Sequence, residues 1–216
     1  MQVEIWSDIA CPWCYVGKRR FEAALAGFPH RDAVTVTWHS FELDPNAPRH
    51  HDMPQPELLA RKYGMSVAEA QAMNARMTEA ATAEGLTFRL DEVKVGNTFD
   101  AHRVLHFADG RGKREALGER LFAAYLGEGA SLGDHATLVA LAAEVGLDAD
   151  DVRVMLETDA FADRVRHDER EAREIGVTGV PYFVLDRRYG VSGAQSPEVL
   201  RGALQQAWDE WLTRSP

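Results

Sequence analysis

The two cysteines of the chain stand together in Cys11-Pro12-Trp13-Cys14. An extended apolar stretch over residues 3–7 comes directly before them, and a helical pattern opens at Tyr15. The start of a helix presents unpaired N–H groups and the positive end of the helix dipole, which favour the thiolate of Cys11 and lower its pKa. Cys14, one turn later, can resolve a mixed disulfide within the molecule. The motif therefore predicts redox chemistry at this pair.

A C-x-x-C motif is also typical of half a zinc site or of a structural pair. No second C-x-x-C and no His pair with finger spacing follows it, whereas a structural zinc site needs four ligands. His102 and His106 have a metal-binding spacing, but one helix would supply only these two ligands and the H-E-x-x-H pattern is missing. The sequence thus predicts no metal site.

Composition is typical of a globular protein of 216 residues, with 45% hydrophobic and 27% charged residues. A net charge of −10 argues against nucleic acid or an anionic membrane as a partner. Met1 leads straight into the first apolar stretch, with no signal-peptide pattern and no run long enough to span a bilayer. We therefore expect a cytoplasmic protein, in which a dithiol is more often catalytic or redox-sensing than a permanent crosslink.

The elements around the motif change character twice along the chain. The helix after Cys14 should end near Gly27, and residues 34–41 alternate as a strand before a loop marked by Pro45, Pro48, Pro54 and Pro56. Residues 57–159 carry the signals of several helices. The first has a capping box at Ser66 and Gly85 as its terminator, and the second runs from Asn97 or Thr98 to Gly110. A third ends at Gly127, a fourth is capped by Asp134, and a short fifth covers residues 152–156. Residues 161–175 form a helix closed by Gly176, Val180-Pro181 leads into a strand with a hairpin partner at 188–192, and Ser196-Pro197 opens the last helix.

This order of elements resembles the thioredoxin superfamily, and the helical insertion resembles its DsbA-like branch. The resemblance implies an α/β thioredoxin fold, a central mixed sheet flanked by helices, with an all-α insertion domain. Residues 1–48 and 161–216 would form the thioredoxin-like domain and residues 49–160 the insertion. Val180-Pro181 resembles the cis-proline loop of that fold, which implies that Pro181 faces Cys11 and that the backbone of Val180 pairs with an extended substrate.

Three motifs in register narrow the resemblance to the FrnE-type group, which is akin to 2-hydroxychromene-2-carboxylate isomerases and kappa-class glutathione transferases. They are Asp8-x-x-Cys11-Pro12-Trp13-Cys14-Tyr15-x-Gly17, Asn97-Thr98-x-x-Ala101-His102-Arg103 and Gly176-Val177-x-Gly179-Val180-Pro181. In the isomerase and transferase relatives the first cysteine position is a serine that serves glutathione. This chain keeps both cysteines, so the resemblance favours a thiol–disulfide oxidoreductase or disulfide isomerase. Its substrates would be protein or small-molecule disulfides and thiols, with no cofactor beyond the redox-active disulfide and with glutathione as a candidate cosubstrate.

The resemblance also assigns the site. Cys11 is the nucleophile and Cys14 the resolving thiol, Pro181 completes the catalytic set, and Pro12, Trp13 and Val180 contact substrate. Asn97, His102 and Arg103 either line a substrate cleft or serve capping and core hydrogen bonding.

Two departures from the family pattern bear on mechanism. The position of the buried acid found in many thioredoxin-fold enzymes is Ile5, with Glu4 on the opposite pleat, so that Asp8, Glu4 or solvent would accept the proton of Cys14. The chain also lacks the second cysteine pair of some group members, so a partner thiol must recycle it. Two other functions remain open: a glutathione-dependent isomerase or transferase of a small aromatic molecule, and a non-catalytic, redox-switched binding protein.

Overall fold

The computed structural model describes residues 1–214, and its chain divides into two compact units. One unit comprises residues 1–43 together with the chain from Asp168 onward, and the other comprises residues 44–167. The second boundary falls inside helix α8 (Ala162–Glu174), because one continuous helix contributes residues to both units. The domains predicted from the sequence, 1–48 with 161–216 and 49–160, place this whole helix in one domain and remain a prediction.

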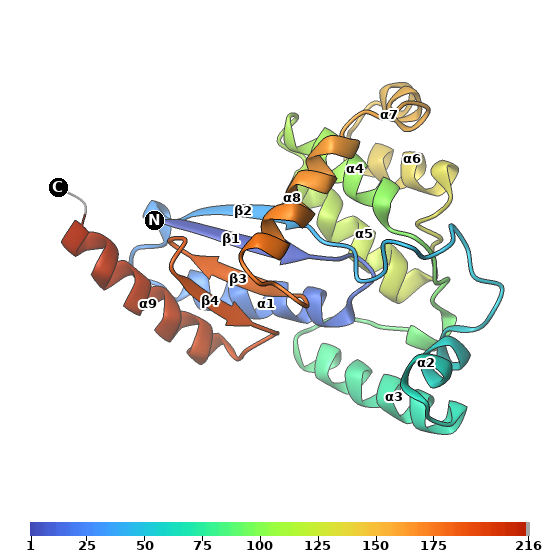
Figure 1. Cartoon of the computed structure of the whole chain (residues 1–216), viewed down its shortest axis with the longest axis horizontal. Helices are drawn as coiled ribbons and strands as arrows, with labels where there is room; N and C mark the ends of the chain where they lie inside the picture. The colour runs from blue at the N-terminus through green and yellow to red at the C-terminus, as the bar shows by residue number, and fades with distance from the viewer. Residues whose placement is uncertain (215–216) are drawn as a thin grey trace. The chain divides into compact units, whose positions relative to one another are not determined.

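A four-stranded mixed sheet forms the centre of the first unit (Figure 1). Its strands are β1 (Gln2–Ser7), β2 (Thr35–Ser40), β3 (Tyr182–Leu185) and β4 (Tyr189–Ser192), in the spatial order β2-β1-β3-β4. Strand β1 pairs in parallel with β2 and antiparallel with β3, which pairs antiparallel with β4. The predicted α/β thioredoxin fold is confirmed.

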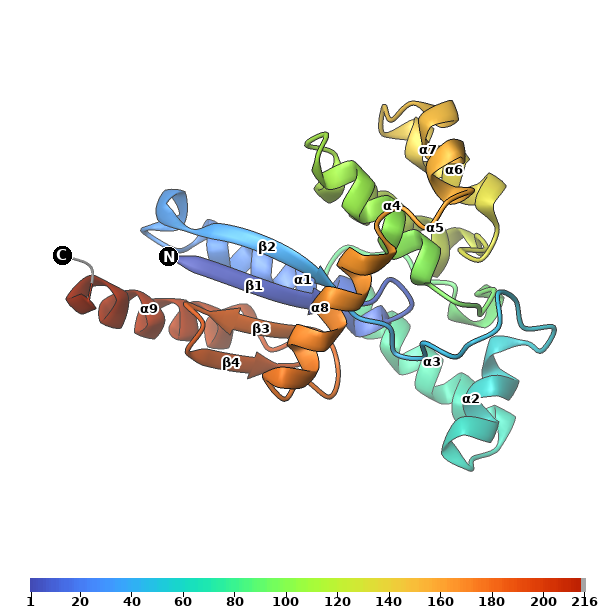
Figure 2. The ribbon, with the colours of Figure 1, turned by 45° about the horizontal axis from the view of Figure 1, so that its top comes forward.

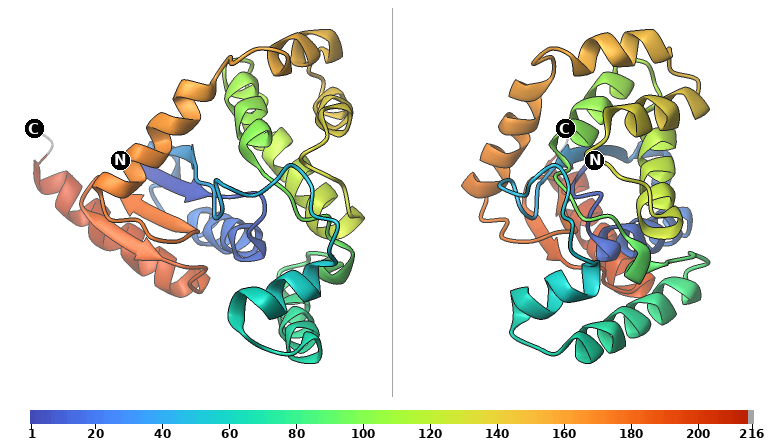
Figure 3. Two further views of the ribbon diagram at one scale, coloured as in Figure 1. Left: turned by 45° about the vertical axis from the view of Figure 1, so that its right-hand side comes forward. Right: turned by 90° about the vertical axis from the view of Figure 1, so that its right-hand side faces the viewer.

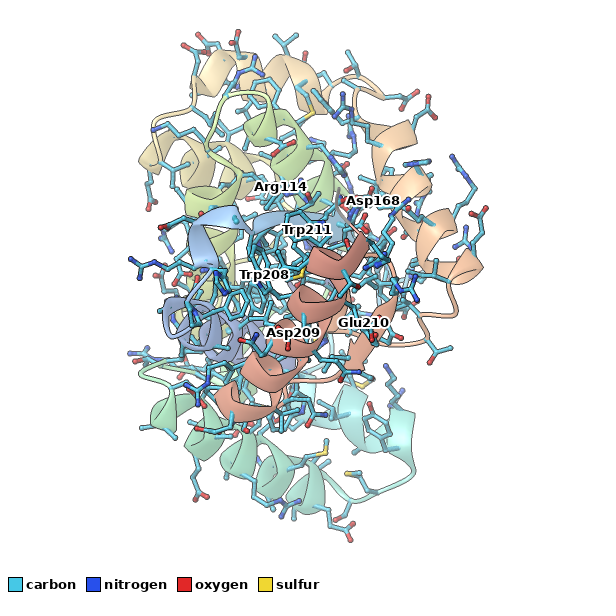
Figure 4. All side chains as sticks on the ribbon, turned by 90° about the vertical axis from the view of Figure 1, so that its left-hand side faces the viewer. Arg114, Asp168, Trp208, Asp209, Glu210 and Trp211 are labelled. Carbon is cyan, nitrogen blue, oxygen red and sulfur yellow. The ribbon has the colours of Figure 1, made fainter. Side chains whose placement is uncertain are left out.

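Alternation along β1 sends successive side chains to opposite faces of the sheet. Val3 and Ile5 are buried in one core with residues of helices α1 (Pro12–Ala26) and α9 (Pro197–Arg214). Trp6 belongs to a separate core on the other face, where it packs with Ala172 of α8. Figure 2 shows the ribbon of α8 passing across the ends of strands β1 and β3. Figure 4 looks onto α9, where the rings of Trp208 and Trp211 lie 4.8 Å apart. Each face of the sheet is thus covered by helix, and each face has its own hydrophobic core.

Helix α1 begins at Pro12 with Cys11 as its N-cap, so the predicted position of the dithiol at the helix start is confirmed, although the readable helical pattern opens only at Tyr15. Proline is favoured at the first helical position because its fixed φ suits the helix and its missing N–H would have no partner there. Apolar periodicity alone does not show this, since it becomes readable only after the first turn. The helix ends at Ala26 with Gly27 as its C-cap, as predicted.

The second unit is built from helices, and consecutive helices along the chain pack against each other (Figure 3). Its helices are α2 (Gln55–Tyr63), α3 (Val67–Ala83), α4 (Phe99–Asp109), α5 (Arg114–Glu128), α6 (His135–Glu144) and α7 (Ala149–Leu156). Short 3-10 turns occur at Leu90–Glu92 here and at Arg31–Ala33 in the first unit. The predicted capping box at Ser66 and the cap at Asp134 are confirmed. Two details are wrong: Pro56 lies in the first turn of α2, and α5 continues through Gly127 to Glu128, with Gly129 in the left-handed conformation after it.

Within the described part of the chain, no helix is long and apolar enough to cross a membrane.

Candidate active site

Cys11 occupies the N-cap of α1, directly after the turn that follows β1. Its backbone is extended, with φ −93° and ψ 110°, and its N–H donates to the carbonyl of Asp8 at 3.1 Å. The N–H of Cys14 donates to the carbonyl of Cys11 at 3.0 Å. Both cysteines are free thiols in the structure. The local fold therefore brings the two sulfur-bearing residues onto one helical turn, with Cys11 at the end where backbone N–H groups are unpaired.

The Val180-Pro181 loop lies against Cys11, and its peptide bond is cis, as predicted. The Sγ of Cys11 donates to the carbonyl oxygen of Val180 at 3.5 Å, although 169 positions separate the two residues in the sequence. The carbonyl of Pro181 accepts a hydrogen bond from the N–H of Gly193 at 2.8 Å, just beyond β4. The sheet thus holds this loop at its place beside the first thiol.

Gly17 of α1 is the contact point between the helix and this loop. A Cβ at position 17 would lie 2.8 Å from Cγ of Pro181 and 3.5 Å from Cβ of Ala194. The first distance is shorter than any real carbon contact, so only glycine permits the observed approach. The glycine in the Asp8-to-Gly17 motif therefore sets how close the Val180-Pro181 loop comes to the dithiol.

The side chains of the motif differ sharply in exposure. Cys14 is fully buried, Cys11 is 5% exposed, and Trp13 is 45% exposed. Pro12 fills the first helical position between them. The indole of Trp13 is thus the exposed part of the motif, and of the two cysteines only Cys11 retains any contact with solvent.

Burial raises the pKa of the Cys14 thiol well above its usual range. The hydrogen bond and the charge of Cys11 raise this pKa further, whereas the hydroxyl of Ser7 and the backbone of Asp8 lower it. The Oγ of Ser7 is buried and has no regular hydrogen-bond partner within the described residues, so its polar neighbour is the sulfur of Cys14. Sequence reasoning did not single out Ser7, but strand alternation places it on the same face as Ile5, toward α1.

The raised pKa of Cys14 predicts how the stability of the reduced protein depends on pH. The folded state holds this proton more tightly than the unfolded state, in which a cysteine titrates near about pH 8.5. The free energy of unfolding should therefore fall as the pH rises above that value. Urea unfolding of reduced wild type and of Cys14→Ala between about pH 7 and 10 checks this. The wild type should lose stability more steeply, and parallel slopes would contradict the assignment.

The structure places both Ile5, which occupies the position of the usual buried acid, and the two carboxylates predicted as proton acceptors for Cys14. Ile5 lies on the α1 face and is fully buried among apolar side chains. Glu4 points to the opposite face, where its carboxylate binds the guanidinium of Arg187 at 2.9 and 3.1 Å. The carboxylate of Asp8 accepts the N–H groups of Ala10 at 3.2 Å and Leu43 at 2.8 Å, and so shapes the turn before Cys11. Glu4 is thus separated from Cys14 by the sheet. The hydroxyl of Ser7 and the backbone of Asp8 contact the Cys14 thiol.

The remaining predicted site residues lie in the second unit. Asn97 accepts the N–H of Phe99 at 2.8 Å at the start of α4, and His102 is fully buried in that helix. Arg103 is also buried, and its guanidinium donates to Asp100 at 2.7 Å and to the carbonyl of Ala160 at 2.9 Å. These contacts correspond to the capping and core alternative for Asn97 and Arg103. A role of the three residues in substrate binding stays a prediction.

Several known proteins are similar to this chain in sequence or in structure. The chain is 53% identical to the probable DsbA oxidoreductase SCO1869 from Streptomyces coelicolor, with a TM-score of 0.95 over 100% of this chain and 92% of that one. It is 30% identical to the protein YwbO of Bacillus subtilis (strain 168), over 94% of this chain and 96% of YwbO. The cytosolic disulfide reductase DsbM from Pseudomonas aeruginosa, solved with GSH, shares the fold at 17% identity, with a TM-score of 0.65 over 97% of this chain and 100% of that one.

The model of the DSBA-like thioredoxin domain matches residues 2–205, which include the Cys11–Cys14 pair, the helical insertion and the Val180-Pro181 loop. The family that the three sequence motifs indicated is therefore confirmed. The chain belongs to the DsbA-like thioredoxin family, whose members are generally thiol–disulfide oxidoreductases.

Proposed function

We propose that this protein is a thiol–disulfide oxidoreductase in which Cys11 attacks and Cys14 resolves. The observation that carries the proposal is the position of the two thiols: Cys11 is the N-cap of α1 beside the Val180 carbonyl, and Cys14 is fully buried one turn behind it. Such an arrangement lets an external disulfide reach the first sulfur but not the second. The exposed indole of Trp13 provides an apolar contact for the substrate next to the reacting sulfur.

The exchange proceeds in two displacements. The thiolate of Cys11 attacks one sulfur of a substrate disulfide, forms a mixed disulfide, and releases the other substrate sulfur as a thiolate. Deprotonated Cys14 then attacks the sulfur of Cys11 and releases the second substrate thiolate, which leaves the Cys11–Cys14 disulfide. Two electrons have passed from the protein to the substrate, and the reverse sequence oxidises a substrate dithiol. The proton of Cys14 passes to the substrate thiolate released in the first displacement, while the Ser7 hydroxyl and the Asp8 backbone stabilise the Cys14 thiolate.

Glutathione is the proposed recycling partner, because the chain has no further cysteine to supply a second dithiol. Two glutathione thiols reduce the Cys11–Cys14 disulfide and leave as glutathione disulfide. The structural likeness to DsbM, which was solved with GSH, supports a small thiol as the reductant. A cytoplasmic location is part of this proposal, since that compartment maintains a reducing glutathione pool.

A redox titration coupled to turnover tests the proposed function. The protein is equilibrated with graded ratios of reduced to oxidised glutathione, alkylated, and weighed by mass spectrometry, while reduction of a protein disulfide is followed in parallel. A single two-electron transition of Cys11 and Cys14, together with glutathione-driven turnover, is expected. A titration without turnover would favour the redox-switched binding protein. Glutathione-dependent conversion of an aromatic substrate that survives Cys11→Ser would favour the isomerase or transferase instead.

A further inference from the structure

A cluster of polar side chains, from almost fully buried to exposed, lies on the face of the sheet opposite α1. Strand alternation turns Glu4 away from the Ile5 face, and β2, α8 and the β3–β4 turn each add polar side chains beside it. The members of this cluster are Glu4, His39, Asp168, Glu171 and Arg187. All of them belong to the first unit, and Figure 4 marks Asp168 on α8. None of them takes part in the thiol chemistry proposed above.

His39 is held in one orientation by its neighbours. Its ring stacks on Trp6 with centroids 4.4 Å apart and an angle of 14° between the planes. Its Nδ1 lies 3.1 Å from Oδ1 of Asp168, whose Oδ2 accepts the N–H of Ser40 at 2.7 Å. Because a carboxylate only accepts hydrogen bonds, Nδ1 carries the hydrogen and donates it. Metal-ligating histidines are oriented in the same way by a carboxylate on the other ring nitrogen.

The free end of the imidazole faces another acceptor. The Nε2 of His39 is buried, and within residues 1–214 it has no hydrogen-bond partner, although Oε1 of Glu4 is only 3.4 Å away. When the imidazole is neutral, the hydrogen on Nδ1 leaves a lone pair on Nε2, and this lone pair faces a carboxylate oxygen. Two electron-rich atoms at this separation are stabilised by a cation placed between them.

The carboxylates of the cluster already converge on a positive charge. The guanidinium of Arg187 binds Glu4 through Nε and Nη2 and binds Glu171 through Nη2. The Arg187 side chain is 61% exposed and extends from the β3–β4 turn, so it can move into solvent without disturbing a core. Glu4, by contrast, is almost fully buried and cannot follow.

We propose that Glu4, His39 and Glu171 form a binding site for a divalent transition metal of the zinc class, which takes the position of the Arg187 guanidinium. One ligand atom from each residue lies within 4.8 Å of the others. Tetrahedral zinc ligands bound at about 2.1 Å are about 3.4 Å apart, which matches the 3.4 Å between Nε2 of His39 and Oε1 of Glu4. Glu171 of α8, whose side chain is 19% exposed, supplies the third ligand.

The donor set determines the kind of metal. One imidazole nitrogen with two carboxylate oxygens suits zinc and its late first-row neighbours, whereas magnesium and calcium take oxygen ligands alone. Such an ion would join β1, β2 and α8 and would therefore stabilise the first unit, on the face away from the dithiol. The sequence led us to expect no metal site, because these three ligands share no local spacing.

Zinc titration of a Cys11→Ser/Cys14→Ser protein tests the site without competition from the thiols. We expect one zinc ion per chain, weakened at least about tenfold by His39→Ala or Glu171→Gln and about 10–100-fold by Asp168→Asn, which frees the ring. Arg187→Gln should tighten binding, because it removes the competing cation. Glu174→Gln, one turn further along α8 and exposed, is the matched control and should bind like the parent.

A thermal readout separates loss of the site from loss of the fold. Zinc should raise the unfolding temperature of the parent protein and of Glu174→Gln, but not that of Glu171→Gln, which keeps the size of the side chain and removes its charge. The proposal is overturned if the parent binds no zinc. It is also overturned if His39→Ala and Glu171→Gln bind as tightly as the parent, or if only substitution of His50 and His51 abolishes binding.

Discussion

Cys14→Ser incubated with a disulfide-containing protein should accumulate a covalent complex through Cys11, whereas Cys11→Ser should form no complex and should turn over at the uncatalysed rate. The reason is the order in which the two sulfurs can be reached. Cys11 is the N-cap residue and is 5% exposed, so it forms the mixed disulfide. Cys14 is fully buried and reaches only the sulfur of Cys11. Without Cys14 the resolving attack is lost and the intermediate persists.

Non-reducing electrophoresis followed by mass spectrometry of the cross-linked peptides measures this outcome. Dithiothreitol should cleave the complex, and the intermolecular disulfide should map to Cys11. Both variants replace sulfur by oxygen at buried positions, so circular dichroism and urea unfolding serve as the control for folding. A mixed disulfide at Cys14 in the Cys11→Ser protein would contradict the assignment of nucleophile and resolving thiol.

The dithiol and the loop beside it could be predicted from the sequence because their signals are local. Two cysteines at a fixed spacing after an apolar strand report a helix N-terminus, and a Gly-Val-Pro turn before an apolar strand reports the loop. Only the family resemblance predicted that these two segments meet, and the 3.5 Å contact between Cys11 and Val180 confirms it. The exact first residue, Pro12, could not be read from periodicity, because the apolar pattern of the helix shows itself only from Tyr15.

The polar cluster on the other face could not be predicted, for a physical reason. Glu4, His39 and Arg187 come from three segments whose contact depends on the order of strands in the sheet. Each residue alone is an unremarkable charged or titratable position in a strand or turn. A single acidic residue within an apolar strand does carry a weak signal, since burial of a carboxylate requires a charged or hydrogen-bonding partner. The identity of that partner is a property of the tertiary structure.

Apolar periodicity also overestimated burial at the ends of helices. Val67 and Ile175 continue the apolar periodicity of their helices, but both are exposed. Val67 is the first residue of α3, and Ile175 comes directly after the last residue of α8. Both residues therefore lie at helix ends. Met77 and Ala172, which lie well inside these helices, are buried. Periodicity therefore predicts which face is buried better than it predicts where that face ends.

Gly17→Ala should lower turnover with protein disulfides by about 10–100-fold, because displacements near 1 Å from reacting groups have costs of this size. The added Cβ would lie 2.8 Å from Cγ of Pro181, and a proline ring cannot rotate away as a flexible side chain would. The Val180-Pro181 loop must therefore shift, and the contact between the Val180 carbonyl and Cys11 shifts with it. Both thiols stay in place on α1, so the rate at which a small alkylating reagent modifies Cys11 should change little.

Gly202→Ala supplies the matched control, since it makes the same substitution within a helix. A Cβ at Gly202, inside α9, meets no atom within 4 Å, so alanine there should stabilise the protein by about 0.5–1 kcal/mol and leave turnover unchanged. At Gly17 the same gain in helix propensity is opposed by the contact with Pro181, so urea unfolding should show a smaller gain or a net loss. Comparison of kcat/KM for a protein disulfide and a small disulfide then locates the defect. If Gly17→Ala matches Gly202→Ala in both stability and turnover, the loop has room to move, and close packing at Gly17 does not position it for catalysis.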